Sequence, residues 1–459
     1  MKRSWRWPLA GFVVGGLVGA TLLTVNIVGA FVGDPAGVVG PQVDSGFNGE
    51  ILHTPPLLVP RGQAVELAYE VACAPSADRP GAACSPKGSV HVRGVGDEQF
   101  ANVPLVAGSR GRLSATIGAG YTLGAGFDYY VEIEDGRGSS QSLPAAGHDV
   151  PQHVWTVGGD TNVDLEEHLF GRTRAPGELV ARAEWGSGGR QLGLSSAQEQ
   201  ARIGPSAFDV APDGSVVVLD QVNQRLALYP RGRAQRNLPI PFDGGEGDLA
   251  IGGDGTIYVL DDGGAAMPVP VVRSFDGDGR PIAGTPIAEP VADMIRVGPD
   301  GPMVHGYPSE LWFPTGSAKP PLSPAGQTAL ARPGRVVGGG LEVVVHASPG
   351  QARFALVRGA QVVNSWHLTS STSLGEVQLA EPYGGGLLVV LRLWTEAQAE
   401  FRVLRLTPGG LAESFSVDRA EWAESASLSR FRLHGDTLYQ LRSDPSGVEV
   451  AAFEIGGTK

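Results

Sequence analysis

Three polar side chains that could bind a ligand, Asp220, Asn223 and Arg225, follow the apolar stretch VVVL at residues 216–219. An arginine guanidinium can hold a carboxylate through two parallel hydrogen bonds, so this cluster is a candidate binding corner. In the structural alternative, the carboxylate and the amide hold Arg225 and join two turns of the chain. We expect the structural role and keep ligand binding as the alternative.

Aromatic side chains near expected loops are a second set of candidates for binding, because aromatic residues carry much of the energy of protein interfaces. The set consists of Tyr307, Trp312 and Trp394, with Trp422 as a further member. For each residue the alternative is burial between sheets. The set therefore predicts a recognition surface only if these side chains reach the loops.

Sequence patterns for catalysis and metal binding are missing. The nine histidines form no HxxxH, HExxH or Cys-His cluster, and His305, His346 and His434 differ in their positions relative to nearby turns. The sequence FDGDGR at residues 275–280 begins like a calcium loop but lacks the later carboxylate, so we expect a hairpin turn. A GxSxG elbow, a Walker loop and a Rossmann fingerprint in the right context are also missing. We predict no metal, no cofactor and no catalytic residue.

The N-terminus combines the cations Lys2, Arg3 and Arg6 with an uncharged run from Pro8 to Val32. As a helix this run would be about 37 Å long, enough to cross a hydrocarbon core of about 30 Å. The leading cations keep that end in the cytoplasm, which places the remaining chain outside the membrane. We predict a single-pass signal anchor over residues 1–33. A cleaved signal peptide, which would give a secreted protein, is the alternative.

The two cysteines, Cys73 and Cys84, are separated by the segment APSADRPGAA, whose proline and glycine let the chain fold back. In an exported protein this spacing predicts a disulfide, worth about 3 kcal/mol through loop closure. Metal binding would need partners that the nearby sequence lacks.

Composition limits the fold and the partners. The 67 glycines and 35 prolines, with only 18% charged residues, favour short strands and tight turns, so we predict an all-β fold. A net charge of -13 repels phosphate backbones, so nucleic acid is not expected as a partner. The excess of arginine over lysine indicates a GC-rich bacterial genome.

The pattern of strands and turns divides the exported part of the chain. Residues 34–49 lack periodicity and read as a linker. Residues 50–150 contain short alternating stretches separated by Gly, Pro and Asp turns, as a β-sandwich needs. Residues 151–176 are less regular and are predicted to be a connector to a region of repeats at residues 177–459.

The repeats are marked by turns at intervals of about 40 to 50 residues. The equivalent turn positions are Asp213, Asp254, Asp300, Gly339, Gly385 and Gly435. A four-stranded sheet with two apolar faces needs a neighbour on each side, so these six units predict a closed six-bladed β-propeller. The last unit lacks one strand, and we expect the stretch GELVARAEWG at residues 177–186 to supply it and to latch the ring.

Two stretches resemble known families. The stretch IGPSAFDVAPDGSVVVLDQVNQRLALY at residues 203–229 resembles an NHL repeat, with an Asp220–Asn223–Arg225 corner, and the unit after it keeps YVLD. This resemblance implies a propeller in a family that includes binding scaffolds and lyases acting in the central channel. The stretch FDYYVEIEDGRG at residues 127–138 resembles a strand of immunoglobulin-like or fibronectin-type modules, which bind or space more often than they catalyse.

We predict a membrane-tethered, extracytoplasmic protein that uses the propeller as a recognition platform for an envelope protein or a cell-wall polymer. A lyase or hydrolase in the propeller channel is the enzymatic alternative, and a spacer in an envelope assembly is a third. Titratable side chains that converge at the ring's centre would favour the enzyme.

Overall fold

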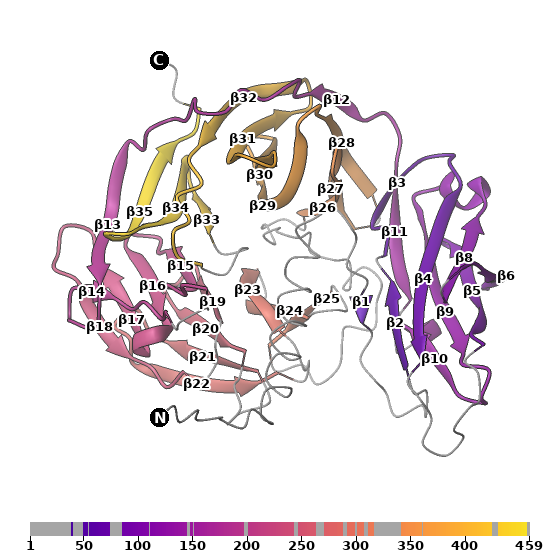
Figure 1. Cartoon of the computed structure of the whole chain (residues 1–459), viewed down its shortest axis with the longest axis horizontal. Helices are drawn as coiled ribbons and strands as arrows, with labels where there is room; N and C mark the ends of the chain where they lie inside the picture. The colour runs from indigo at the N-terminus through magenta and orange to yellow at the C-terminus, as the bar shows by residue number, and fades with distance from the viewer. Residues whose placement is uncertain are drawn as a thin grey trace, which may run out of the picture.

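The computed structural model is almost entirely β-structure (Figure 1), which confirms the predicted all-β fold. It describes residues 38–39, 49–53, 55–73, 85–109, 111–144, 147–149, 151–196, 201–242, 247–262, 270–287, 292–298, 301–306, 311–315, 341–359, 361–424 and 430–456. Within these ranges the helical elements are the 3-10 turns η1 (Ala119–Thr122), η2 (Gly147–Asp149) and η3 (Gln221–Asn223).

Two sheets near the N-terminus pack face to face as a β-sandwich. The first has the order β1 (Val38–Val39), β2 (Gly49–His53), β4 (Val65–Cys73), β8 (Arg112–Ile117), β7 (Val106–Ala107). The second has the order β3 (Leu58–Pro60), β11 (Gln152–Val157), β9 (Gly126–Glu134), β5 (Lys87–Gly94), β6 (Ala101–Pro104), with β10 (Ser140–Leu143) on β9. Alternate residues, such as Leu67 and Tyr69 of β4 and Val90 and Val92 of β5, fill the core between the sheets. The finer immunoglobulin-like assignment stays a prediction.

The remaining sheets are arranged around a centre as the blades of a β-propeller (Figure 1). Blade 1 consists of β15 (Ala207–Val210), β16 (Val216–Asp220), β17 (Arg225–Tyr229) and β18 (Arg236–Pro239). Blade 2 consists of β19 (Gly247–Ile251), β20 (Ile257–Asp261), β21 (Val271–Phe275) and β22 (Pro281–Pro286), and blade 3 of β23 (Ala292–Gly298), β24 (Gly301–Gly306) and β25 (Leu311–Pro314).

The C-terminal half of the propeller takes strands from two parts of the chain. Blade 4 consists of β26 (Leu341–Ser348), β27 (Gln351–Arg358), β28 (Gln361–Thr369) and β12 (Thr161–Asp164). Blade 5 consists of β29 (Ser373–Tyr383), β30 (Gly386–Trp394), β31 (Ala399–Thr407) and β32 (Gly410–Val417). Blade 6 has the order β33 (Phe431–His434), β34 (Thr437–Asp444), β35 (Gly447–Glu454), β13 (Glu178–Trp185), β14 (Gln191–Leu192).

Apolar strands hold neighbouring blades together. In β16 every residue from Val216 to Asp220 is buried, because the strand is covered on both faces. Shared apolar cores join blade 1 to blade 2, blade 2 to blade 3, blade 4 to blade 5, blade 5 to blade 6, and blade 6 to blade 1. A corresponding core between blades 3 and 4 is not found among the described residues, so closure of the ring stays a prediction.

The predicted turns are confirmed where the structure describes them. Asp213 and Asp254 lie between the first and second strands of blades 1 and 2, where their carboxylates accept hydrogen bonds from the backbone N–H of Ser215 and Thr256. Gly385 and Gly435 occupy the corresponding turns of blades 5 and 6 with positive φ, which glycine adopts without a steric penalty. Asp300 and Gly339 lie outside the described residues.

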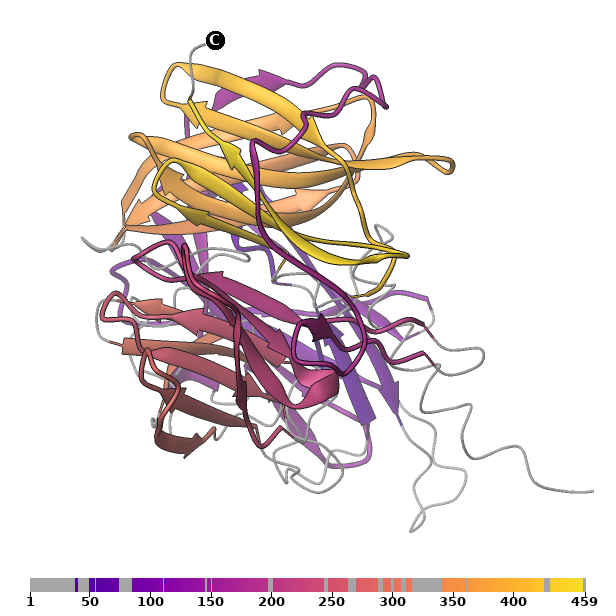
Figure 2. The ribbon, with the colours of Figure 1, turned by 90° about the vertical axis from the view of Figure 1, so that its left-hand side faces the viewer.

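The predicted pairing of the stretch 177–186 with the last unit is confirmed. Strand β13 pairs antiparallel with β35, from Glu178 opposite Ala452 to Glu184 opposite Gly447. The residues between β12 and β13 also contact blade 5, where Arg174 N donates to Ser416 O. Figure 2 shows this segment crossing the edges of the gold C-terminal sheets.

One strand of blade 4 comes from the residues predicted to form a connector. Strand β12 runs parallel to β28, with Thr161 opposite Trp366 and Asp164 opposite Thr369. Val163 of β12 is buried in the core shared by blades 4 and 5. The residues that follow the sandwich are therefore part of the propeller.

The sandwich packs directly on the other face of blade 4. Leu58 of β3, with Trp155 and Val157 of β11, forms one apolar cluster with Val344 of β26 and Ala355 and Val357 of β27. The views in Figures 1 and 2 place the sandwich beside the propeller at this point. The two parts of the chain are thus joined by a buried apolar contact.

Several predictions about the N-terminal region fall outside the described residues. The predicted anchor lies in residues 1–37, which the structure does not describe, and Cys84 is also outside, so the anchor and the Cys73–Cys84 disulfide stay predictions. In the described ranges, no helix has the length and apolar character needed to cross a membrane.

Candidate functional site

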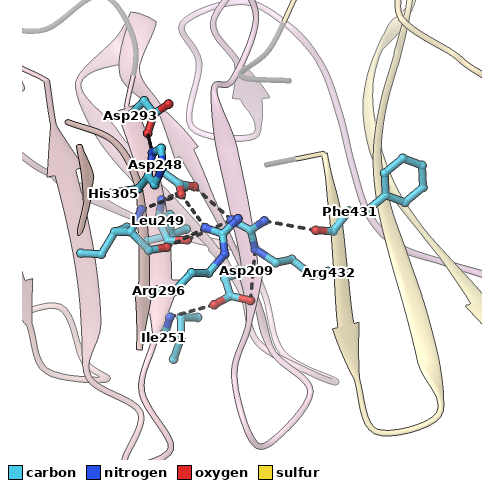
Figure 3. Close-up of polar contacts among 10 residues, drawn as sticks. Asp209, Asp248, Leu249, Ile251, Asp293, Arg296, His305, Phe431 and Arg432 are labelled. Carbon is cyan, nitrogen blue, oxygen red and sulfur yellow. Dashed lines mark hydrogen bonds and ion pairs between the residues drawn. The ribbon is translucent and has the colours of Figure 1, made fainter. Parts of the chain in front are cut away.

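Charged side chains from four blades meet at the centre of the propeller (Figure 3). Asp209 comes from β15, Asp248 from β19, Arg296 from β23 and Arg432 from β33, which are the first strands of blades 1, 2, 3 and 6. The exposed fractions of these residues are 2%, 0%, 5% and 2%, respectively. We call these four residues the central network.

Asp248 is the residue that connects the network. Its Oδ1 accepts hydrogen bonds from Leu249 N at 2.8 Å and from Arg432 Nη2 at 3.0 Å. Its Oδ2 accepts from Ile295 N at 2.9 Å and from Arg296 Nη1 at 2.6 Å. Both carboxylate oxygens therefore have two donors each.

Arg432 and Asp209 extend the network towards blade 1. Arg432 Nη1 donates to Phe431 O at 3.1 Å and Nη2 to Leu249 O at 3.2 Å, while Nε lies 3.6 Å from Asp209 Oδ1. Asp209 Oδ2 accepts from Ile251 N of blade 2 at 2.8 Å. Each charged group is thus used to connect the first strands of different blades.

These contacts favour a structural role for the central network. Buried charges are tolerated when they are paired and hydrogen-bonded, and removing one partner leaves a costly unpaired charge. A carboxylate that already accepts four hydrogen bonds has little remaining capacity to accept a proton or bind a substrate. The charged side chains do converge at the ring's centre, but in an arrangement that ties strands together.

A histidine and an aspartate of blade 3 lie next to the central network (Figure 3). His305 Nδ1 and Asp293 Oδ1 are 2.6 Å apart, and the exposed fractions of their side chains are 1% and 32%. An imidazole held by a carboxylate is the arrangement used for general base catalysis. Access to the buried ring from solvent would be needed for that role.

The predicted Asp220–Asn223–Arg225 corner is assembled in blade 1. Asp220 Oδ2 accepts from Arg225 Nε and from Asn223 Nδ2, each at 2.8 Å, and Oδ1 accepts from Gly193 N at 2.9 Å. Arg225 Nη2 donates to Gly188 O and Gln191 O, at 3.1 and 2.5 Å. The corner therefore joins blade 1 to the residues around β14 of blade 6, which supports the expected structural role.

Blade 2 builds a related corner from different residues. Asp261, like Asp220, ends the second strand of its blade and is fully buried. Its cation is Arg273 of β21, whose Nη2 lies 3.6 Å from Asp261 Oδ2. The corner is thus retained although Asn-x-Arg does not follow Asp261 in the sequence.

The structure places the predicted aromatic residues in different situations. Trp394 ends β30 and is half-buried, and Trp422 is also half-buried, with Arg202 over its ring at 4.5 Å. Tyr307 lies outside the described residues, and nothing is described of the Trp312 side chain in β25. In the described part of the chain, no group of three or more His, Cys, Asp or Glu residues is placed to hold a metal ion.

The central network was not predicted from the sequence. Its members occur singly, in AFDV, GDLAI, ADMIRVG and FRLH, and no short motif connects them. A charged residue inside an apolar strand is itself a signal, because such a charge needs a buried partner. The partner could not be named without the arrangement of the blades.

Comparisons with known proteins identify no family. No family model matches the chain, and no curated protein matches it. Similar solved structures include a virginiamycin B lyase from Staphylococcus aureus, with a TM-score of 0.34, 10% identity, and coverage of 58% of this chain and 99% of that one. A luciferin-regenerating enzyme has a TM-score of 0.32 and 10% identity over 55% of this chain and 92% of that one. A protein from Lactobacillus plantarum has a TM-score of 0.27 and 10% identity over 81% and 100%.

Proposed function

We propose that the chain is a membrane-tethered, extracytoplasmic binding protein in which a six-bladed propeller is the recognition platform. Its partner would be an envelope protein or a cell-wall polymer. The observation that carries the proposal is the hydrogen bonding of Asp248, which commits the central charges to holding blades together. The outer loops are then the surfaces left for recognition.

The docked sandwich supports a platform more than a flexible spacer. Trp155, which is 3% exposed, and Leu58, which is 1% exposed, are buried against blade 4. An apolar contact of this kind holds two modules in one orientation, which suits presentation of a binding surface at a fixed angle. The uncharged run Pro8 to Val32 supports the tether.

The proposal is tested by binding of the full-length chain to isolated cell-wall material and to envelope proteins. In cosedimentation, saturable binding to washed cell walls is expected if the partner is a polymer. If the partner is a protein, crosslinking in membrane vesicles is expected to join it to propeller residues. If the chain shows no saturable sedimentation with cell walls and no crosslink to residues 177–459 forms, the proposal is contradicted. A protease that digests the domains from outside intact spheroplasts checks the topology.

An enzyme is the second candidate, and the His305–Asp293 pair is the observation that favours it. Beside the network, this pair could position a general base for a lyase or hydrolase. Mass spectrometry of wall fragments incubated with the chain tests this function. A product that forms with the wild type and is lost in His305→Gln would support the enzyme, and unchanged fragments would count against it.

A further inference from the structure

Two histidines and an arginine lie side by side across three strands of blade 4. His346 of β26 is opposite Arg353 of β27, and Arg353 is opposite His367 of β28. Residues directly opposite each other in antiparallel strands point to the same face of the sheet, with their Cβ atoms about 5 Å apart. We call His346, Arg353 and His367 the blade 4 row.

The blade 4 row lies on the face of blade 4 that packs on the sandwich. Arg353 and Ala355 share this face because side chains alternate along β27, and Ala355 belongs to the apolar contact with the sandwich. Figure 1 shows β26, β27 and β28 beside β3 and β11 of the sandwich. The row continues this face beyond the apolar contact, next to the turn at residues 349–350, where His346 is exposed and His367 is half-buried. A molecule outside the protein can therefore reach the row.

Three groups of the row can carry a positive charge, and one carboxylate is in contact with them. Arg353 Nε donates to Asp160 Oδ2 at 3.3 Å, and the two Nη groups of Arg353 make no hydrogen bond with the described residues. His367 Nε2 lies 3.0 Å from Gln351 Oε1, whereas His346 has no hydrogen-bond partner in the described part of the chain. Asp160 therefore balances Arg353 but leaves no negative charge for the two histidines.

The other described charged side chains on the elements around the row balance one another near neutral pH. They are Asp160 before β12, Asp164 on β12, Glu342 on β26, Arg358 on β27 and Arg61 in the sandwich. Together with Arg353 these are three carboxylates and three guanidinium groups. Glu342 and Arg358 are at least four residues from the row along their strands, which is about 13 Å. His153 of β11 is held by Asp128 within the sandwich, with Nδ1 2.7 Å from Oδ1. The row therefore gains net positive charge only when its own histidines are protonated.

Protonation of the two histidines creates a repulsion that an anion relieves. The pKa of both His346 and His367 is lowered from 6.5, first because the protein partly removes water from the rings and second because Arg353 is positively charged. Asp160 opposes this shift at His367. Like charges directly opposite each other in a sheet are destabilising. An anion bound between them removes this penalty, so protonation and anion binding strengthen each other by linkage.

We propose that the blade 4 row binds an acidic group of a cell-wall polymer, a carboxylate or a phosphate, when the surrounding medium is acidic. The two Nη groups of Arg353 hold two oxygens of that group, with an imidazolium on each side. The whole chain carries a net charge of -13 and repels polyanions, so the attraction is confined to this row. The inference rests on the proposed function and chooses its polymer alternative.

The test measures cosedimentation of the full-length chain with washed cell walls at pH 7.5 and pH 5, at constant ionic strength. The variants are His346→Gln, His367→Gln and the two combined, and the matched control is His148→Gln, whose side chain is 70% exposed in the sandwich. Two treated wall samples separate the sources of the acidic group: in one the carboxyl groups are converted to amides, and from the other the phosphate is stripped. Thermal melts at both pH values verify that each variant is folded.

We expect wild type and His148→Gln to bind walls about tenfold more tightly at pH 5 than at pH 7.5, because hydrogen bonds to charged groups are the strong ones. The combined variant is expected to bind equally at the two pH values, and each single variant to show a smaller difference than wild type. The treated wall that loses the gain in acid identifies the acidic group as a carboxylate or a phosphate.

Three results would overturn the site. They are wall binding by wild type that is equal at the two pH values, a gain in acid that the combined variant retains, and a gain that survives removal of both kinds of acidic group. Each of these leaves the proposed function standing, because the walls are still bound. A chain that binds neither cell walls at either pH nor envelope proteins would overturn both proposals.

Discussion

Protonation of His53 in the sandwich core gives a pH dependence that can be worked out from the structure. His53 Nδ1 lies 2.8 Å from Ala68 O, Nε2 lies 2.6 Å from Tyr129 Oη, and the ring stacks on Tyr69 at 4.2 Å. Burial lowers the pKa of His53 from 6.5 to about 4, although the hydrogen bond to Ala68 O opposes the shift. The imidazole is therefore neutral in the folded chain near neutral pH.

The sign and size of the effect follow from linkage. Below pH 6.5 the unfolded chain binds a proton at His53 that the folded chain does not bind, so stability falls as the pH falls towards 4. Each pKa unit is worth about 1.4 kcal/mol, and the difference between 6.5 and about 4 gives about 3 kcal/mol in total. Above pH 6.5 the contribution of His53 no longer changes.

The assay compares urea unfolding of wild type and His53→Gln between pH 7.5 and 4. Subtracting the two series removes the carboxylates that both chains share. The stability advantage of wild type over the variant is expected to shrink by about 3 kcal/mol across this range. His148→Gln, in which a side chain that is 70% exposed is changed, is the matched control and should follow wild type. A constant difference between wild type and His53→Gln, or an NMR titration of the His53 ring with a midpoint near 6.5, would refute the reasoning.

Three other substitutions test the contacts that hold the fold together. Asp220→Ala is expected to lower the free energy of unfolding by about 3 kcal/mol in denaturant melts, because it leaves the Arg225 guanidinium buried without its carboxylate; a loss below 1 kcal/mol, as expected for the exposed turn variant Asp213→Ala, would contradict this. Asp248→Asn is expected to lower the free energy of unfolding by about 3 kcal/mol, since it weakens the contacts of Arg296 and Arg432. The same change is expected to speed amide hydrogen exchange in both β23 and β33. Unchanged exchange in either strand would remove that strand from the network. Trp155→Ala is expected to lower the free energy of unfolding by about 3 to 4 kcal/mol and to let a protease cut the chain between the sandwich and β12. If the protease cuts the variant no faster than wild type, the apolar contact with blade 4 is dispensable.

Those parts of the fold that have a local signal could be predicted from the sequence. The turns at Asp213 and Asp254 could be predicted because Asp-Gly supplies a hydrogen-bonding carboxylate and a residue with positive φ within a few positions. The pairing of β13 with β35 could be predicted because the last repeat unit lacked one strand and the strand at residues 177–186 belonged to no unit.

Parts of the fold that depend on distant segments could not be predicted. Strand β12 contributes only Val163 to a core, and its partner β28 lies about 200 residues later, so neither its length nor its apolarity identifies it. The buried charges between blades 5 and 6 were also missed, because Glu376 and Arg430 are ordinary charged residues until the two blades bring them together.

The pairing of β13 with β35 has a consequence for the order in which the molecule can assemble. Strand β35 lies between β34 and β13, and β12 needs β28, so early-synthesised strands wait for partners made hundreds of residues later. While the ribosome is still working, β12 and β13 have exposed edges that can pair with other chains. Blade 1 has no such dependence for its own four strands. A cell making this protein must therefore keep residues 161–192 from mispairing until the final blade is complete.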